Sequence, residues 1–381
     1  MKESYIGNHF PNSTQLCLLR AAFSSDISAQ RAWEKWTSLI DFDLVDPASY
    51  KLLPLVSRNP ALRHIKDPLF EKCKGIYRKT WLTNHLMWQK TRPILLQLAQ
   101  ERTEQVVLLK GMAMILEYYR DFGLRVIGDI DILIAQKDLS HTIELLQQHG
   151  LKALFLPINP TQPLSLNRWN SAGFSSQDLH IDVHWRLMLE SSPLLDDIVF
   201  KNTRPTTHQG ITVPSPTELL LHTCVHGAKY SPVPLIRWIP DAMTLLKEHI
   251  DWERLELLAK SSHVCNALHI TLGYLEEVFQ APIPSQILKN LQKSPSYSLQ
   301  HLEYQSNLRG QPYLAGWYRY CIRNQCLTTW QQSKGIIRYL QASALLASPW
   351  LVPVYGVYWI MKRIYRKSRL FIKSILPKNI F

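Results

Sequence analysis

The spacing of apolar positions changes along the chain, and the changes mark where different structures are expected. Residues 1–104 show helical patterning in long segments such as 28–41 and 77–103, with no repeat or low-complexity run between them. The pattern shortens at Gln105, where residues 105–110 (QVVLLK) form a brief, β-branched apolar run typical of a buried strand. The sequence therefore predicts a helical N-terminal region followed by a core that contains strands.

Within that core, short alternating segments are separated by helical ones. The predicted elements are a helix over 111–119, a loop over 120–128, a strand over 129–134 (DIDILI), an amphipathic helix over 139–149, a Pro-rich loop over 157–176 and a strand over 180–187 (HIDVHWRL). Gly150 stands just past the predicted helix, where a left-handed glycine often ends one. This order describes a compact α/β module.

From Ser215 onward the pattern is helical again, with Pro216 opening a segment that ends near Gly227. Further helices are expected over 235–248 and 251–278. The fold class is thus predicted as α+β, with a small mixed-sheet core flanked by N- and C-terminal helical regions. The expected parts are an N-terminal helical region (1–104), the α/β core (105–214), a helical substrate-side region (215–303) and a basic aromatic helical tail (304–381).

The net charge of +13 is concentrated at one end of the 381-residue chain. After Glu303 there is no acidic residue but 12 Lys and Arg, so the rest of the chain is nearly neutral. Residues 339–361 carry no formal charge, but prolines and a glycine interrupt them and seven cations follow. Spanning would carry those cations across the membrane, against the positive-inside rule.

We therefore expect residues 339–381 to pack on the protein or to lie on an anionic membrane surface. Nucleic acid is a rival partner for the same charge, although no stable nucleic-acid complex is predicted.

Six cysteines without a CxxC pair, and no apolar run behind a basic start in residues 1–10, favour the cytoplasm. The expected location is cytoplasmic, with a possible peripheral position at the inner membrane face.

Three carboxylates suggest metal chemistry. Asp129 and Asp131 alternate along a predicted strand, so both project from one face and repel each other unless a cation lies between them. Asp182 lies on the later strand, on the face that also carries His180, His184 and Arg186 by alternation. Carboxylates of this kind suit Mg²⁺ or Mn²⁺, and two such ions can clamp the oxygens of a phosphoryl displacement. Upstream, Lys110-Gly111 ends a strand and opens a helix, an arrangement that suits a triphosphate.

Each of these signals also has a structural interpretation. An isolated Asp-x-Asp is often a solvated edge. Arg125 either pairs with Asp121 or faces the site. His184 is either a core histidine or a group near the substrate, and Arg186 is either structural or substrate-holding. His222 and His226 have a zinc-compatible spacing on a helix, but no third ligand accompanies them.

The segments LLKGMAMILEYYRDFGLRVIGDIDILI (108–134) and HIDVHWRL (180–187) resemble the uncharacterised nucleotidyltransferase family of the polymerase-β-like superfamily. That family has a Leu-Lys-Gly turn, a Gly-x-Arg loop, Gly-Asp-x-Asp and a later Asp-x-His-Trp strand. The likeness continues through PTELLLHTCVHGAKY (216–230) and IRWIPDAMTLL (236–246), and is traceable from about residue 45 to 262. The Lys-Gly turn precedes the Asp-x-Asp by 18 residues, which makes the composite pattern specific.

The resemblance implies a role for each matching residue. Asp129 and Asp131 correspond to two metal-binding carboxylates, and Asp182 to the third, which can also accept a proton. The remaining implied positions are Lys110, Gly111, Gly128 and Arg125 for nucleotide binding, and His184, Arg186 and His226 on the substrate side. The commoner superfamily turn is Gly-Ser, where this chain has Lys-Gly-Met, so the base of the nucleotide is left open.

The expected function is transfer of a nucleoside monophosphate from an NTP to an acceptor hydroxyl, with two Mg²⁺ or Mn²⁺ ions and release of pyrophosphate. The acceptor is undetermined among small molecules, peptides or proteins, and tRNA. One alternative is a glycosyltransferase of the Asp-x-Asp type, which would need several strand–helix units before residue 129. Another is a non-catalytic, membrane-associated binding protein that retains the fold.

Overall fold

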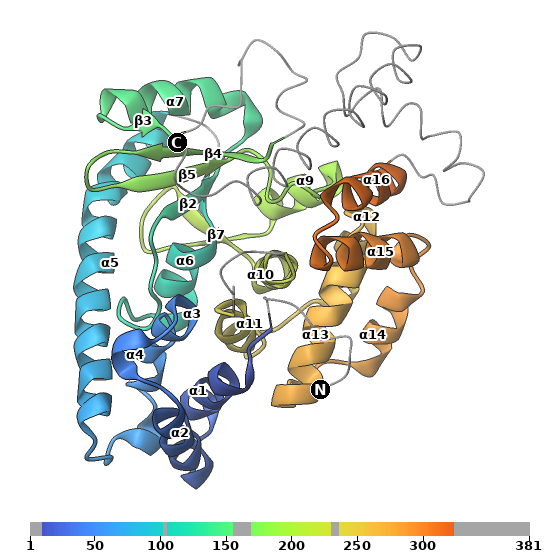
Figure 1. The fold of residues 1–381 in the computed structure, drawn as a ribbon. Helices are drawn as coiled ribbons and strands as arrows, with labels where there is room; N and C mark the ends of the chain where they lie inside the picture. The colour runs from blue at the N-terminus through green and yellow to red at the C-terminus, as the bar shows by residue number, and fades with distance from the viewer. Residues whose placement is uncertain (1–9, 102–104, 155–168, 230–235, 324–381) are drawn as a thin grey trace, which may run out of the picture. The chain divides into compact units, whose positions relative to one another are not determined.

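The computed structural model describes residues 10–101, 105–154, 169–229 and 236–323 (Figure 1). The expectations for residues 339–381 and for most of the loop after residue 157 therefore lie outside the described residues. The chain divides into two compact units, Met1–Ser294 and Pro295–Phe381. The four-part division expected from the sequence stays a prediction.

The first unit begins with helices, as the pattern predicts. They are α1 (Ser13–Phe23), α2 (Ile27–Leu39), η2 (Phe42–Leu44), α3 (Pro47–Tyr50), α4 (Leu53–Val56), η3 (Pro60–Leu62) and α5 (Pro68–Glu101). Helix α5 starts earlier than expected because Pro68 takes a first-turn position and the Asp67 carboxylate accepts the Leu69 N–H at 2.8 Å. It then runs alongside β1 and β7 of the sheet (Figure 1).

The described residues contain a mixed sheet of seven strands in the order β3-β4-β5-β2-β1-β7-β6. The strands are β1 (Val106–Leu108), β2 (Ile130–Leu133), β3 (Lys152–Ala153), β4 (Ser171–Ser175), β5 (His180–His184), β6 (Thr203–Pro205) and β7 (Ile211–Pro214). Pairs β2–β5 and β1–β7 are parallel, and the other neighbouring pairs are antiparallel. Between β1 and β2 the chain forms α6 (Lys110–Ala113) and the π-helix η4 (Met114–Tyr119), and after β2 it forms η5 (Gln136–Asp138) and α7 (Leu139–Gln148).

Alternation divides the central strands into an apolar face and a polar face. Ile130 and Ile132 of β2 and Ile181 and Val183 of β5 are almost fully buried. The intervening positions of β5 carry His180, Asp182 and His184, and Asp131 has the matching position on β2. A shift of one residue would move the isoleucines to the polar face, so burial of the apolar face fixes the register that aligns these polar groups.

The remaining helices of the first unit follow the sheet. They are α9 (Pro193–Lys201, before β6), α10 (Pro216–Gly227), α11 (Trp238–Leu245), α12 (Trp252–Ser261), α13 (Cys265–Phe279) and α14 (Ser285–Gln292). Helix α10 packs against β7 and against α11, α12 and α13 (Figure 1). The α+β fold class, with a mixed sheet flanked by helices, is confirmed.

Three local expectations need correction. The predicted loop 157–176 includes β4, whose small polar residues (SAGFS) gave no strand signal but pair along the whole of β5. The predicted helix 251–278 is two helices, α12 and α13, because the helix is interrupted at His263, whose backbone is left-handed with a φ of 54°. Residues 188–214, for which no elements were expected, form α9, β6 and β7.

The second unit has two described helices, α15 (Tyr297–Leu308) and α16 (Pro312–Arg323), which pack together. Cys321 and Ile322 are buried with Leu299. Glu303, the last acidic residue of the chain, accepts hydrogen bonds of 2.7 Å from Arg319. Among the described helices, none combines the length and apolar character needed to cross a membrane.

Candidate functional site

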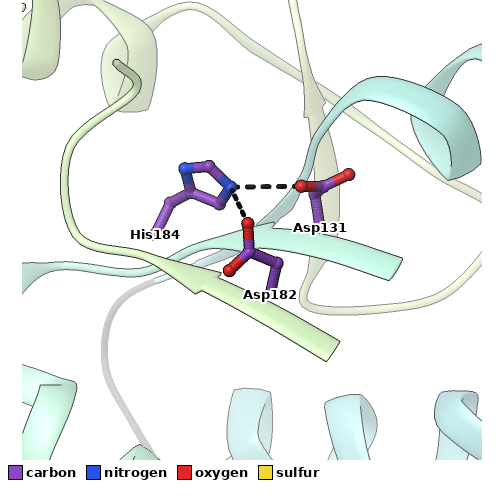
Figure 2. Close-up of side chains that lie close together, drawn as sticks. All are labelled: Asp131, Asp182 and His184. Carbon is purple, nitrogen blue, oxygen red and sulfur yellow. Dashed lines mark hydrogen bonds and ion pairs between the residues drawn. The ribbon is translucent and has the colours of Figure 1, made fainter. Parts of the chain in front are cut away.

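Two carboxylates and an imidazole converge on the polar face of the sheet. Asp131 on β2 and Asp182 on β5 are register partners on adjacent parallel strands, so their side chains leave the same face. The Nε2 atom of His184 lies 3.1 Å from Oδ1 of Asp131 and 3.1 Å from Oδ2 of Asp182. Figure 2 shows the imidazole facing both carboxylates. Among the described residues, these three form a group whose ligand atoms all lie within 4.8 Å of one another.

The second ring nitrogen of His184 is held by Asn170. The side-chain amide of Asn170 lies 3.2 Å from Nδ1. If the amide nitrogen donates, Nδ1 accepts, which leaves the proton on Nε2 facing the carboxylates. Burial disfavours the imidazolium, but the hydrogen bonds to Asp131 and Asp182 outweigh it and raise the pKa of His184.

Lys110 approaches the same group from the end of β1, the strand that borders β2 on the side away from β5. The Leu109 N–H donates to the Asp131 carbonyl at 2.9 Å, which places the next residue beside the Asp131 side chain. Nζ of Lys110 hydrogen-bonds Oδ1 of Asp131 and lies 3.4 Å from Nε2 of His184. The backbone of Lys110 is left-handed, with a φ of 44°, which is uncommon for a residue with a side chain. Strain of this kind is often retained where a side chain has to be aimed at a site.

Charge around Asp131 explains its protonation state. Burial would raise its pKa, but the Lys110 ammonium and the His184 hydrogen bond outweigh this and hold the pKa well below its usual range. For Lys110, burial acts to lower the pKa, whereas the charge of Asp131 raises it above the usual value. Asp131 is therefore a carboxylate and Lys110 an ammonium at neutral pH.

Asp129 occupies a different position from the other two aspartates. It lies just before β2 and is exposed, and it does not belong to the group formed by Asp131, Asp182 and His184. Desolvation of its carboxylate by surrounding protein atoms, and then repulsion by the charge of Asp131, raise the pKa of Asp129. The expected strand 129–134 is therefore shorter by one residue at each end, and the first aspartate of the pair stands at its edge.

The loop before β2 is anchored by a buried ion pair. Arg125 binds the Asp241 carboxylate through Nε at 3.0 Å and Nη2 at 2.8 Å, and the Tyr119 hydroxyl donates to the same carboxylate at 2.9 Å. The predicted alternative, pairing of Arg125 with Asp121, is wrong because Asp241 takes that role. Gly111 lies against this loop, where a Cβ atom would overlap Ile127 and come within 2.5 Å of Nη1 of Arg125. Only glycine leaves the loop in place here.

Two pockets meet at Asp129. The first, of about 150 Å³, is named the Lys110 pocket, and its lining includes Lys110, Gly111, Arg125, Asp129, Asp131, His222, His226 and Arg237. The second, of about 600 Å³, is named the Lys51 pocket, and its lining includes Lys51, Gly128, Asp129, Leu154, Gly173, His180, Asp182 and Arg237. Asp129 thus lines both cavities, Asp131 lines the first and Asp182 lines the second.

The other residues expected from the sequence are distributed around these pockets. His226 lines the Lys110 pocket with His222, and burial followed by the charge of Lys110 lowers its pKa to about 3, so it is neutral. Gly128 lines the Lys51 pocket. Arg186 lies beyond the end of β5, where it pairs with Asp196 at 3.4 Å and donates to the Ser191 carbonyl. The chain itself therefore holds the Arg186 guanidinium.

Sequence reasoning missed several residues that line the pockets. Lys51 comes from the helical N-terminal region, just after α3, and no local pattern singled it out. Arg237 and Asp241 lie in the segment IRWIPDAMTLL, which carried part of the family resemblance without an assigned role. Gly173 lies within the predicted loop 157–176, yet it stands opposite Asp182 in the register of β4 and β5.

The mixed sheet, with paired aspartates facing a lysine–glycine turn, defines a nucleotidyltransferase-like core. The sequence matches the family described as uncharacterised nucleotidyltransferase over residues 35–280, which is more than half of the chain. The chain belongs to this family, and its class is therefore that of the nucleotidyltransferases. No curated protein matches the chain. The described residues before β1 contain helices and no strand, contrary to what the glycosyltransferase alternative requires.

Proposed function

We propose that the protein transfers a nucleoside monophosphate from an NTP to a hydroxyl group of an acceptor, with release of pyrophosphate. The observation that carries this proposal is the register pairing of Asp131 with Asp182 beside Lys110. Three carboxylates with one lysine at the junction of two pockets are suited to a reaction in which a phosphoryl centre passes between two bound molecules.

The carboxylate oxygens of Asp131 and Asp182 fit a divalent cation. One oxygen of Asp131 and one of Asp182 lie within 3.1 Å of the same nitrogen, so both carboxylates are directed at one small region. Carboxylate oxygens are the ligands that Mg²⁺ and Mn²⁺ prefer. Asp129, Asp131 and Asp182 would hold two such ions, which would polarise the phosphoryl oxygens and stabilise the charge that develops on them.

The chain's own residues have distinct roles in this proposal. Lys110 would release Asp131 and bind the triphosphate in the Lys110 pocket, which Gly111 also lines. The acceptor hydroxyl oxygen attacks the α-phosphorus, and a new P–O bond forms. The bond between the α-phosphorus and the oxygen bridging to the β-phosphorus breaks, and pyrophosphate leaves with that electron pair. Asp182 accepts the hydroxyl proton.

Nucleotide binding provides the first test. Thermal unfolding of the full chain is measured with ATP, GTP, CTP and UTP, each with and without Mg²⁺ or Mn²⁺. We expect at least one NTP to raise the midpoint only when the metal ion is present, because binding to the folded state stabilises it. The absence of any metal-dependent nucleotide effect contradicts the proposal and favours a non-catalytic protein that retains the fold.

Transfer itself is tested on a natural mixture of acceptors. A cell lysate is incubated with the protein, Mg²⁺ and isotopically labelled NTPs, and mass spectrometry searches for the mass of one added nucleoside monophosphate. The matched control is the D131N variant, which retains the size of the side chain but loses its charge. Labelled products that form equally with D131N would show that the assigned site is not responsible.

A further inference from the structure

The two pockets differ in which part of the candidate site they reach. Lys110 and Gly111 line the Lys110 pocket, whereas Asp182 lines the Lys51 pocket. Asp129 and Arg237 line both. If the triphosphate lies beside Lys110, a molecule in the Lys51 pocket approaches from the side of Asp182, the proposed proton acceptor. The Lys51 pocket is therefore on the acceptor side of the reaction.

Two cations project into the Lys51 pocket without an acidic partner. Across the described parts of the chain, no carboxylate lies at ion-pair distance from Lys51 or from Arg237, although Arg237 donates to the Val126 carbonyl. Burial and then repulsion by a neighbouring cation, Arg237 for Lys51 and Arg125 for Arg237, lower the pKa of both side chains, that of Arg237 to about 10. Both remain charged at neutral pH, at a cost that an anion in the pocket would offset.

The acidic residues of the same pocket do not replace an anion as the partner of Lys51 and Arg237. Asp129 and Asp182 also line it, and the proposed function assigns both to divalent cations. Once those ions are bound, the charge of the carboxylates is compensated, and the positive charges of Lys51 and Arg237 remain. The loaded pocket is then suited to a negatively charged group.

The register of the sheet leaves space for such a molecule. Gly173 on β4 stands opposite Asp182 on β5, so the position beside the carboxylate carries no side chain. A Cβ atom at Gly173 would lie 3.6 Å from the nearest atom of Leu154, an ordinary contact, so packing does not demand glycine here. The pocket volume of about 600 Å³ lies in the range of small-molecule sites.

We propose that the Lys51 pocket binds the acceptor, and that the acceptor is a small hydroxyl compound carrying a phosphate or carboxylate group, which Lys51 and Arg237 bind. This inference rests on the proposed nucleotidyl transfer and specifies its second substrate. Lys51 is a specificity-determining residue: it binds the anion and leaves the reacting hydroxyl to Asp182.

The test compares three probes that share a three-carbon skeleton, namely glycerol 3-phosphate, glycerate and glycerol. Binding of each probe to the full chain, loaded with Mg²⁺ and a non-hydrolysable NTP analogue, is measured by ligand-observed NMR. We expect at least one anionic probe to bind at least tenfold more tightly than glycerol. Comparison of glycerol 3-phosphate with glycerate shows whether the pocket prefers a phosphate or a carboxylate group. Pyrophosphate release with the matching NTP then reports whether the bound probe reacts.

Two variants assign this preference to the pocket. K51Q removes the charge and should reduce the preference for the anionic probe over glycerol at least tenfold, while binding of the NTP analogue is retained. G173V fills the space beside Asp182 and should weaken all three probes without weakening the analogue. K289Q, at an exposed position on α14, is the matched control and should preserve the preference.

The outcomes separate this inference from the proposed function. If the NTP analogue binds with Mg²⁺ but the probes show no anionic preference, or K51Q preserves that preference, the acceptor proposal is overturned and nucleotidyl transfer stands. If none of the three probes binds the loaded chain, the acceptor proposal is overturned as well. If no nucleotide binds in a metal-dependent manner, the proposed function itself fails.

Discussion

Asp131 and Asp182 stand directly opposite each other on adjacent parallel strands, and Nε2 of His184 lies 3.1 Å from an oxygen of each. Residues 51 positions apart in sequence thus present their carboxylates to one small region. Two buried or half-buried carboxylates at this separation repel each other unless positive charge lies between them. In the structure, His184 and Lys110 provide hydrogen bonds to this pair.

Asp182 is the residue whose loss should affect the chemical step most directly. D182N removes the proposed proton acceptor, and we expect a fall in kcat of about 10²–10⁴-fold, the usual contribution of a general base. Binding of NTP should be affected much less. Pyrophosphate release is measured beside D197N, a matched change at an exposed ion pair with Lys201 on α9. A D182N enzyme as active as D197N would remove Asp182 from the mechanism.

Lys110 should compete with divalent cations for Asp131. Its ammonium contacts the Asp131 carboxylate, and a unit charge near 4 Å in a site of intermediate dielectric contributes about 4 kcal/mol. K110Q should therefore bind Mn²⁺ in the absence of nucleotide at least about tenfold more tightly, even after screening by solvent. The measurement is a titration of free Mn²⁺ by electron paramagnetic resonance. Unchanged or weaker Mn²⁺ binding would show that Lys110 does not occupy the cation's place.

Gly111 should be required for the position of the loop before β2. In G111A the added methyl group would overlap Ile127 and Arg125, and we expect a loss of about 1–3 kcal/mol in the free energy of unfolding. The control is G75A on α5, where a Cβ atom has no neighbour within 4 Å. That change should stabilise the protein by about 0.5–1 kcal/mol, because alanine favours a helix interior. Equal effects of the two changes in urea unfolding would contradict the close packing at Gly111.

His226 should make the protein less stable in acid. Burial keeps its imidazole neutral in the folded state, with a pKa of about 3 against an ordinary value of 6.5. Between these values the unfolded chain binds a proton that the folded chain does not. Stability therefore falls as pH drops from 6.5 towards 3, by about 1.4 kcal/mol per pH unit from this residue. Above pH 6.5 this contribution is constant.

The corresponding variant is H226Q. It should flatten the acid side of the curve of unfolding free energy against pH, measured by urea denaturation between pH 4 and 7. His222 lies beside it, and burial also lowers its pKa, so part of the slope should remain. H249Q changes an exposed histidine and serves as the control. An H226Q curve parallel to that of the wild type would contradict a half-buried His226 that stays neutral.

The local pattern of apolar and polar residues was sufficient to predict many of the strands and helix ends of the core. The alternation in DIDILI and HIDVHWRL predicted β2 and β5, because one face of each strand is buried and the other carries polar groups. Pro216 and Gly227 bounded α10, and Gly150 ended the helix after β2, with a φ of 78°. Strand β4 could not be found in this way, because its small residues carry no apolar period and it is defined by pairing with β5.

The sequence by itself determined which residues are candidates for the chemistry: Asp129, Asp131 and Asp182 are recognisable from their spacing on predicted strands and from the family pattern around them. Only the tertiary structure decided how these groups are arranged. Register across β2 and β5 selected Asp131, Asp182 and His184 as one group and left Asp129 at the edge. The ion pair of Arg125 with Asp241, and the pocket that Lys51 and Asp182 both line, bring together residues more than 100 positions apart. Contacts of that range depend on how helices and strands pack, which the local periodicity of a sequence does not encode.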